Sequence, residues 1–272
     1  MEHKNIAFIG AGNMVKAIVS GLVTGGYPAS CITATAPSET RRRPLEQEFS
    51  INTTSDNIAA AEQADVVVLS VKPQMMQDVC ADLRPVDWSN KLVISIAAGI
   101  NCQRLCEMLD HNLNIVRVMP NTPSQLGLGM SGMFAPTQVS ESDKAFAETL
   151  MSAVGKTCWV QKESGINNVI AAAGSAPAYF FLFLEAMQAE AIAQGFDKHT
   201  ARELVQQSAL GAAHMVVANP DIELSTLREQ VTSKGGTTAE ALRTFNQHQL
   251  SDIVSKAMQA AVARAEEMEQ QF

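Results

Sequence analysis

Two glycine-containing segments carry the residues best suited to hold the charged groups of a ligand. The first, Gly10-Ala11-Gly12-Asn13-Met14, follows a strand-like run and opens a helical pattern. In such a turn the first glycine permits a tight bend, and the second lets backbone N–H groups approach a pyrophosphate at the positive end of the helix. The third glycine position of the fingerprint is Val15, so the motif is incomplete. Its place between a strand and a helix nevertheless predicts a dinucleotide-binding site.

The second segment is Gly235-Gly236-Thr237-Thr238, which also precedes a helical pattern. Backbone N–H groups and threonine hydroxyls at a helix start form a site for a small carboxylate. Thr237 and Glu240 also match a capping box, in which two side chains bond the first N–H groups of the helix. Both interpretations can hold together, because a capping box leaves other N–H groups free.

The end of the second expected strand bears on which dinucleotide binds. NAD sites usually place Asp or Glu there to bind the ribose 2′-hydroxyl. This chain instead has Ser38, Glu39 and, after Thr40, the run Arg41-Arg42-Arg43. A hydroxyl and guanidinium groups suit a 2′-phosphate, although the arginines would also suit a solvated helix start, and Glu39 could itself reach the ribose. We therefore expect NADPH, bound through Ser38 and Arg41, with NADH as a weaker alternative.

Further candidates fall at the C-terminal ends of expected strands, where doubly wound sheets bind their ligands. Small residues and prolines at such ends would form a rigid floor beneath a cofactor. The residues expected in this floor are Val71, Lys72, Pro73, Ala97, Ala98, Gly99 and Asn121. A lone lysine at a strand end is often only solvated, so we assign Lys72 no proton transfer.

The elements that must position these residues follow from the apolar pattern. Short β-rich runs alternate with amphipathic stretches in the first half, which predicts an α/β fold with a Rossmann-type, doubly wound parallel sheet. Strands are expected at Asn5–Gly10, Ile32–Ala36, Asp65–Val71, Lys91–Ile96, Asn114–Val118, Gly129–Phe134 and Cys158–Val160. Helices are expected at Met14–Thr24, Glu39–Phe49, Gln74–Leu83, Gln103–Leu109 and Ser142–Val154.

Strand-like runs disappear after Glu163. We therefore expect residues 1–162 to form the NADP-binding domain and residues 163–272 to form an all-helical domain for dimerisation and substrate binding. Its helices are expected at Ile166–Gln194, Thr200–Ala218, Asp221–Gln230, Thr238–Phe245 and Leu250–Gln270. Pro177 should kink the first of these.

An uncharged run from Ser164 to Leu184 is long enough to span a bilayer. It contains Asn167, Asn168 and Pro177, so we expect a helix buried against other helices. Because the residues after it offer a limited core, a second copy of the chain should cover the remainder and give a homodimer.

Composition excludes several classes of protein. A net charge of −8 argues against nucleic acid and anionic membranes as partners. The five cysteines include no C-x-x-C pair, which argues against a disulfide framework and a thiolate zinc site. The N-terminal residues lack the apolar segment of a signal peptide, so we expect a cytoplasmic protein with reduced thiols and no metal.

Taken together, these motifs resemble the pyrroline-5-carboxylate reductase family over nearly the full length of the chain. The segments that carry the resemblance are Gly10–Met14, Ser70–Pro73, Ser95–Gly99, Arg117–Pro123, Gly174–Tyr179 and Gly235–Thr238. There are two departures: Lys234 stands where the family commonly has proline, and Val15 replaces a small residue. Neither change removes a group that the chemistry needs.

The resemblance implies reduction of 1-pyrroline-5-carboxylate to L-proline with NAD(P)H, the last step of proline biosynthesis. It implies that Asn57 lies near the adenosine part of the cofactor and that Thr238 contacts the substrate. It also implies a helical domain that interlocks with its partner in a homodimer, and often rings of dimers. Because a protonated imine is already electrophilic, the site must orient and desolvate it more than protonate it.

Two other functions remain open. A β-hydroxyacid dehydrogenase has a similar build but uses a lysine on the long interdomain helix, and here no lysine lies between Lys162 and Lys198. A non-catalytic NADP-sensing protein would need the dinucleotide site but not the Gly235–Thr238 segment.

Overall fold

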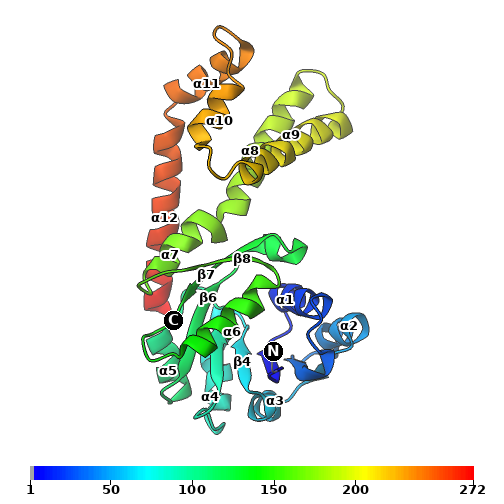
Figure 1. The fold of residues 1–272 in the computed structure, drawn as a ribbon, viewed down its shortest axis with the longest axis vertical. Coiled ribbons are helices and arrows are strands. Elements are labelled where there is room, and N and C mark those ends of the chain that lie inside the picture. The colour runs from blue at the N-terminus through cyan, green and yellow to red at the C-terminus, as the bar shows by residue number, and fades with distance from the viewer. Residues whose placement is uncertain (1–2) are drawn as a thin grey trace. The chain divides into compact units, whose positions relative to one another are not determined.

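The computed structural model describes residues 3–272, which form two compact units (Figure 1). The first unit contains the chain up to Ser175 together with Ala261–Phe272, and the second is Ala176–Ala260. Composition places the boundary earlier, between residues 162 and 163. The difference arises because the residues just after 163 pack against the sheet: the missing side chain of Gly132 leaves room for Val169.

An eight-stranded sheet forms the centre of the first unit. Its strands are β1 (Ile6–Ile9), β2 (Ile32–Thr35), β3 (Asn52–Thr54), β4 (Val66–Leu69), β5 (Leu92–Ser95), β6 (Asn114–Met119), β7 (Gly129–Phe134) and β8 (Gly155–Trp159). The strand order is β3-β2-β1-β4-β5-β6-β7-β8, and only the β6–β7 pair is antiparallel. The predicted doubly wound sheet is therefore confirmed.

Helices cover both faces of this sheet. They are α1 (Asn13–Thr24), α2 (Glu39–Phe49), α3 (Asn57–Gln63), α4 (Pro73–Leu83), α5 (Cys102–Leu109) and α6 (Glu141–Ser152), with the short turns η1 (Ala29–Cys31) and η2 (Thr122–Leu126). Ile6 and Phe8 of β1 join one apolar cluster, and Ala7 and Ile9 join the other. Strands that are apolar at consecutive positions, such as Val66–Leu69, are accordingly buried on both faces.

Two elements were not expected from the sequence. β3 has only three residues, Asn-Thr-Thr, which carry no apolar alternation and are partly exposed at the sheet edge. α3 is short and begins at a cap in which Asp56 Oδ1 accepts a hydrogen bond from the Ala59 N–H at 3.0 Å. Both elements depend on their neighbours more than on their own pattern.

The long helix expected at Ile166–Gln194 is interrupted. It consists of α7 (Gly165–Val169), a π-helical turn η3 (Ile170–Gly174) and α8 (Ala176–Ala193), and the Ser175 N–H donates to the Ile170 carbonyl at 2.8 Å. Pro177 is the second residue of α8, where its missing N–H costs no helical hydrogen bond. The interruption therefore precedes Pro177, the residue that was expected to kink this helix.

The second unit contains α8, α9 (Lys198–Ala218), α10 (Leu224–Gln230), α11 (Thr237–Gln247) and the first half of α12 (Leu250–Gln271). Its interior is small: within Ala176–Ala260 only Ala201 and Val205 are buried. By length and composition, the helical stretch Gly165–Ala193 is apolar enough to cross a membrane.

Candidate active site

The glycine turn after β1 presents a helix start that no side chain caps. Gly10 has a φ of +122°, a conformation that favours glycine, and a Cβ there would lie 3.0 Å from the Ser70 carbonyl oxygen. Gly12 is the N-cap of α1, and a Cβ on it would meet no described atom within 4 Å. The first turn of α1 holds no acidic residue. These N–H groups are therefore suited to bind a phosphate.

The other residues of this turn are accessible to different degrees. Asn13 is exposed, whereas Ala11 and Met14 are half-buried and pack against the apolar cluster that contains Phe8. The contacts of Ala11 and Met14 with this cluster thus fix the backbone of the segment, while Asn13 stays accessible to solvent.

A hydrogen-bond chain joins the same turn to the start of α3. The Gly10 N–H donates to the Thr35 carbonyl at 3.1 Å, and the Thr35 hydroxyl donates to Asn57 Oδ1 at 2.6 Å. Thr35 is fully buried, so this bond fixes Asn57 beside the C-terminal end of β2. That position is compatible with the adenosine role that the family resemblance implies for Asn57.

The three arginines after β2 differ in their contacts. Arg42 Nη1 donates to two backbone carbonyls that follow β2, the second at 3.2 Å, and Arg43 Nε lies 3.8 Å from Glu39 Oε1. The Arg41 side chain is exposed and has no hydrogen-bond or ion-pair partner among residues 3–272. Ser38, the N-cap of α2, is exposed beside it. Arg41 is therefore the guanidinium that is free to bind a phosphate.

The expected cofactor floor is a set of strand ends with mixed exposure. Lys72 is exposed and is the N-cap of α4, and Val71 and Pro73 are half-buried. The next strand end is more enclosed, since Ala97 is buried and Ala98 half-buried. These exposures agree with a surface that supports a cofactor.

Gly99 and Asn121 have structural contacts of their own. Gly99 has a φ of +73°, and its missing side chain makes room for Met268 of α12. Asn121 is buried; its Nδ2 donates to the Ala173 carbonyl at 3.0 Å and its Oδ1 accepts from the Met130 N–H at 2.9 Å. Both residues brace the first unit, and their contact with a cofactor remains a prediction.

The Gly235–Thr238 segment forms a second helix start without a side-chain cap. Gly236 is the N-cap of α11, Thr237 is its first residue, and both threonines are exposed. The capping box predicted from Thr237 and Glu240 is wrong, because Glu240 Oε2 instead accepts from Arg243 Nη2 at 2.8 Å. The helix begins one residue earlier than expected. Its first N–H groups therefore lack a side-chain acceptor, which suits a carboxylate ligand.

A buried charged cluster escaped the sequence analysis. Arg117 on β6 is 1% exposed, and its Nη1 lies 2.7 Å from Glu269 Oε1 and 3.2 Å from Glu163 Oε1. Burial, reinforced by Glu163, raises the pKa of the Cys102 thiol well above its usual range. The available signal was an arginine inside the apolar strand Asn114–Met119.

Metal ligands and disulfides were both expected to be absent. Among residues 3–272 no three His, Cys, Asp or Glu side chains gather as a possible metal site. All five cysteines are free, and burial raises the pKa of the Cys80 thiol to about 12.

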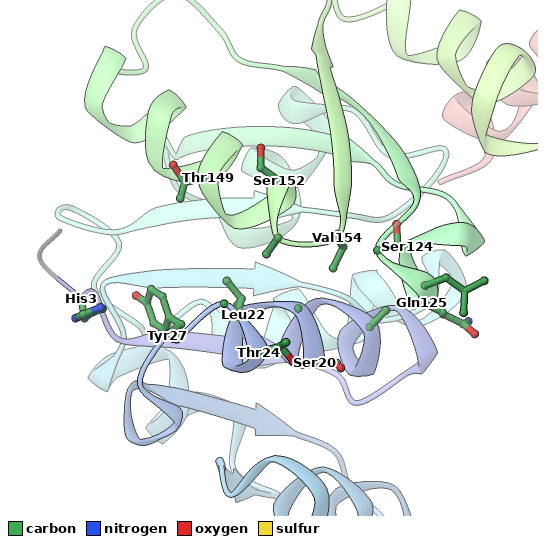
Figure 2. Close-up of a pocket in the computed structure, with 17 residues that line it drawn as sticks. His3, Ser20, Leu22, Thr24, Tyr27, Ser124, Gln125, Thr149, Ser152 and Val154 are labelled. Atoms are coloured by element: carbon green, nitrogen blue, oxygen red, sulfur yellow. The ribbon is translucent and has the colours of Figure 1, made fainter. Parts of the chain in front are cut away.

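One pocket of about 820 Å³ lies away from the predicted residues. Figure 2 shows it between α1, η2 and α6, with Tyr27, Ser124 and Thr149 among its lining residues. None of the predicted cofactor or substrate residues lines this pocket.

Comparison with known proteins supports the same interpretation. A family model described as pyrroline-5-carboxylate reductase dimerisation matches residues 163–268, and one described as NADP oxidoreductase coenzyme F420-dependent matches residues 5–99. The pyrroline-5-carboxylate reductase of Vibrio alginolyticus is 80% identical over 272 residues, which are 100% of each chain. The solved structure of a pyrroline-5-carboxylate reductase from Coxiella burnetii is 40% identical, with a TM-score of 0.92, and covers 98% of this chain and 99% of its own.

A third relative was solved with its cofactor. The crystal structure of Plasmodium falciparum pyrroline carboxylate reductase with NADP bound is 28% identical, with a TM-score of 0.87, and covers 99% of each chain. The relationship thus extends over both units rather than over the Rossmann-type half alone. On its open glycine turn, its second helix start and its full-length identity to these enzymes, the chain belongs to the pyrroline-5-carboxylate reductase family.

Proposed function

We propose that the chain reduces 1-pyrroline-5-carboxylate to L-proline at the expense of NADPH, the last step of proline biosynthesis. The observation that carries this proposal is the 80% identity, over the whole chain, to a pyrroline-5-carboxylate reductase. The starts of α1 and α11 each follow one of the two glycine segments. Like those of α2, α4, α7 and α10, they have no side-chain cap among residues 3–272, so their N–H groups can bind the anionic parts of cofactor and substrate.

In the first unit, the proposed cofactor site begins at the start of α1. The N–H groups there bind the pyrophosphate, Ser38 and Arg41 bind the 2′-phosphate, and Asn57 lies against the adenosine. The complete proposed set is Gly10, Ala11, Gly12, Asn13, Met14, Ser38, Arg41, Asn57, Val71, Lys72, Pro73, Ala97, Ala98, Gly99 and Asn121. Two observations support the fit: a Cβ on Gly12 would meet no described atom within 4 Å, and the exposed Arg41 side chain has no partner among residues 3–272. NADH remains the weaker alternative. NADPH supplies the hydride when it is bound.

In the second unit, Gly235, Gly236, Thr237 and Thr238 form the proposed substrate site. Backbone N–H groups at the start of α11 hold the substrate carboxylate, and the Thr238 hydroxyl oxygen accepts a hydrogen bond from the ring N–H of the iminium. Thr238 thereby orients an iminium that is already electrophilic, so alignment and exclusion of water provide most of the rate enhancement.

The chain forms a homodimer through its helical residues, which match the dimerisation model of the family. We further propose that dimers assemble into rings, that the protein is cytoplasmic, and that the apolar stretch Gly165–Ala193 is covered by the partner chain rather than by lipid. The asparagines Asn167 and Asn168 in this stretch and the acidic net charge support that choice.

The activity can be tested by following NADPH oxidation with 1-pyrroline-5-carboxylate and, separately, NADP reduction with a panel of hydroxyacids. We expect oxidation with the cyclic imine alone, with proline as the product. Binding of NADPH without turnover would indicate a sensing protein, and turnover of hydroxyacids with NADP would indicate a dehydrogenase.

A further inference from the structure

Arg117 is the centre of a buried cluster that joins distant segments of the first unit. Its Nη1 contacts Glu163, which precedes α7, and Glu269, which lies near the end of α12. Asn167 of α7 donates from Nδ2 to Glu269 Oε2 at 3.2 Å, and the Cys102 N–H at the start of α5 donates to Glu163 Oε1 at 2.7 Å. One guanidinium thus links β6, α7 and α12.

Stabilisation of the fold does not by itself explain this cluster, because burying its charged and polar groups costs free energy. Arg117 Nε and Nη2 and Asn167 Oδ1 are buried, and none has a hydrogen-bond partner in the described part of the chain. Two carboxylates face one guanidinium, and apolar residues often replace buried ion pairs at no loss of stability. The buried Arg117 guanidinium is better explained if it fixes the positions of the segments that carry Glu163 and Glu269.

The segments that the cluster holds are the two through which the chain passes between its units. The chain leaves the first unit after Ser175 and returns to it at Ala261. α7 lies just before the first crossing, and α12 is a continuous helix that contains the second. Figure 1 shows the end of α12 beside α7, as the bond between Asn167 and Glu269 requires.

Two neighbouring contacts fasten the same end of α12. Met268 occupies the space left by the missing side chain of Gly99, and Arg104 Nε donates to the Phe272 carbonyl at 2.6 Å. The last turn of this helix is therefore a fixed part of the cofactor-binding unit.

We propose that Arg117 is a positioning residue for hydride transfer, acting through Glu163 and Glu269 on the two segments that join the cofactor-binding unit to the unit that carries Thr238. This inference rests on the proposed function. Since its side chain is 1% exposed, Arg117 is not available to substrate and acts only through these carboxylates. Misplacement of reacting groups by about 1 Å can cost about 100-fold in rate, so loosening these segments should lower kcat.

Three variants separate positioning from stability. Glu269→Gln keeps the size of the side chain and removes its charge, while Glu163 still pairs with Arg117. Arg117→Lys keeps the positive charge but loses the fork of donors. Replacing both Arg117 and Glu269 by Met removes the guanidinium together with one of its two carboxylates. Glu163, which is partly exposed and still accepts from the Cys102 N–H, is the one charge that loses its partner, so the chain should still fold.

Asp143→Asn is the matched control. Asp143 is also a partly buried carboxylate of the first unit, and it pairs with Lys4 at 3.1 Å and with Asn114 Nδ2 at 2.8 Å. It lies on α6, outside both connecting segments.

The measurements are kcat, the primary isotope effect with 4-deuterated NADPH, the Kd for NADPH and Tm. We expect Glu269→Gln and the double Met variant to lower kcat about tenfold or more, to increase the isotope effect, and to change Kd by less than about twofold. Arg117→Lys should retain more of kcat than the double variant, and Asp143→Asn should keep the wild-type kcat.

Wild-type kcat and isotope effect in the Glu269→Gln and double Met variants would overturn the positioning role. So would a fall in kcat that Asp143→Asn shows equally. If the wild-type protein does not turn over 1-pyrroline-5-carboxylate at all, the proposed function fails first, which this set of measurements distinguishes.

Discussion

The two units of the chain bury apolar side chains in opposite ways. In the first, clusters on both faces of the sheet enclose whole strands, such as Val66–Leu69. In the second, Ala201 and Val205 are the only buried residues within Ala176–Ala260, and Phe180, an aromatic residue of α8, is 69% exposed. The first unit has a core of its own, whereas the second needs a surface supplied by another molecule.

This difference in burial shows that apolar residues serve two purposes in this chain: they form an internal core in the first unit and an interface with another molecule in the second. In the sheet, apolar residues meet helices of the same chain. α8 carries apolar residues around most of its circumference, as a helix surrounded on all sides does, but its own chain covers only part of it. The helical unit is thus a half-core, which a homodimer completes.

The largest effect should come from a charge on the exposed face of α8. Phe181 is 65% exposed in the single chain, and Phe181→Asp would place an unpaired carboxylate in the dimer interface. Such a charge costs about 3–5 kcal/mol, or about 100-fold or more in dimer affinity. Sedimentation equilibrium at micromolar concentration should show monomers, and activity should be lost.

Leu126→Asp is the control for this variant. Leu126 is 79% exposed but belongs to the first unit, so the substitution should leave dimer and activity intact. A monomeric Phe181→Asp protein with normal activity would contradict the half-core interpretation.

The second effect concerns the substrate segment of the helical unit. Thr238→Ala should lower kcat/KM about 10- to 100-fold, equivalent to about 1.5–3 kcal/mol, because the substrate loses its orienting hydroxyl. NADPH affinity and Tm should barely change, since Gly236 and not Thr238 is the N-cap of α11. Thr238→Ser should keep most of the activity. Strong destabilisation with normal turnover would show that the residue serves the helix instead.

A smaller effect tests the cofactor site of the first unit. Arg41→Ala should weaken NADPH binding about tenfold, or about 1.5 kcal/mol, and NADH binding much less, because only NADPH carries a 2′-phosphate. Fluorescence titration gives both Kd values. Arg43→Ala is the matched control, since Arg43 pairs with Glu39 and should discriminate less. Equal losses for both cofactors in Arg41→Ala would indicate a solvated helix start.

The smallest effect is a local one within the first unit. Burial alone would raise the pKa of Asp143, but hydrogen bonds from Asn114, Ser140 and Lys4 lower it below its usual value. Since the folded-state pKa lies below the unfolded one, the carboxylate stabilises the fold above the unfolded pKa, and this contribution is lost as pH falls through the folded pKa.

Asp143→Asn should therefore lower Tm at neutral pH by an amount equivalent to about 1 kcal/mol, and the difference from wild type should shrink in acid. Scans of Tm against pH measure this. The Tm difference should not depend on protein concentration, in contrast to variants of the dimer interface. A pH-independent difference would refute this assignment.

The fold was largely predictable, because alternating apolar runs encode both sheet and helices. β3 was not, since three polar residues gain their strand conformation from pairing with β2. A kink at Pro177 was expected, but the interruption is a π-helical turn that precedes the proline. This turn and the residue before it contact Gly132, through Val169, and Asn121, through the Ala173 carbonyl. Such partners are far away in sequence.

The site was predictable where a motif determines the backbone, as at Gly10 and Gly12. The site was not predictable where two partners compete for one side chain: Glu240 pairs with Arg243 instead of forming the capping box. The role of Arg117 was not predictable either, because its partner Glu269 lies on a different element near the other end of the sequence.

The discontinuity of the first unit also affects the order of its biosynthesis. Protein synthesis runs from the N-terminus, so Ala261–Phe272 emerges from the ribosome only after all of Ala176–Ala260. Until then Arg117 has no Glu269, and the space beside Gly99 has no Met268. The unit that is translated first is therefore completed last. Nascent chains that lack Ala261–Phe272 should expose the surface around Arg117 and Gly99 to chaperones and proteases.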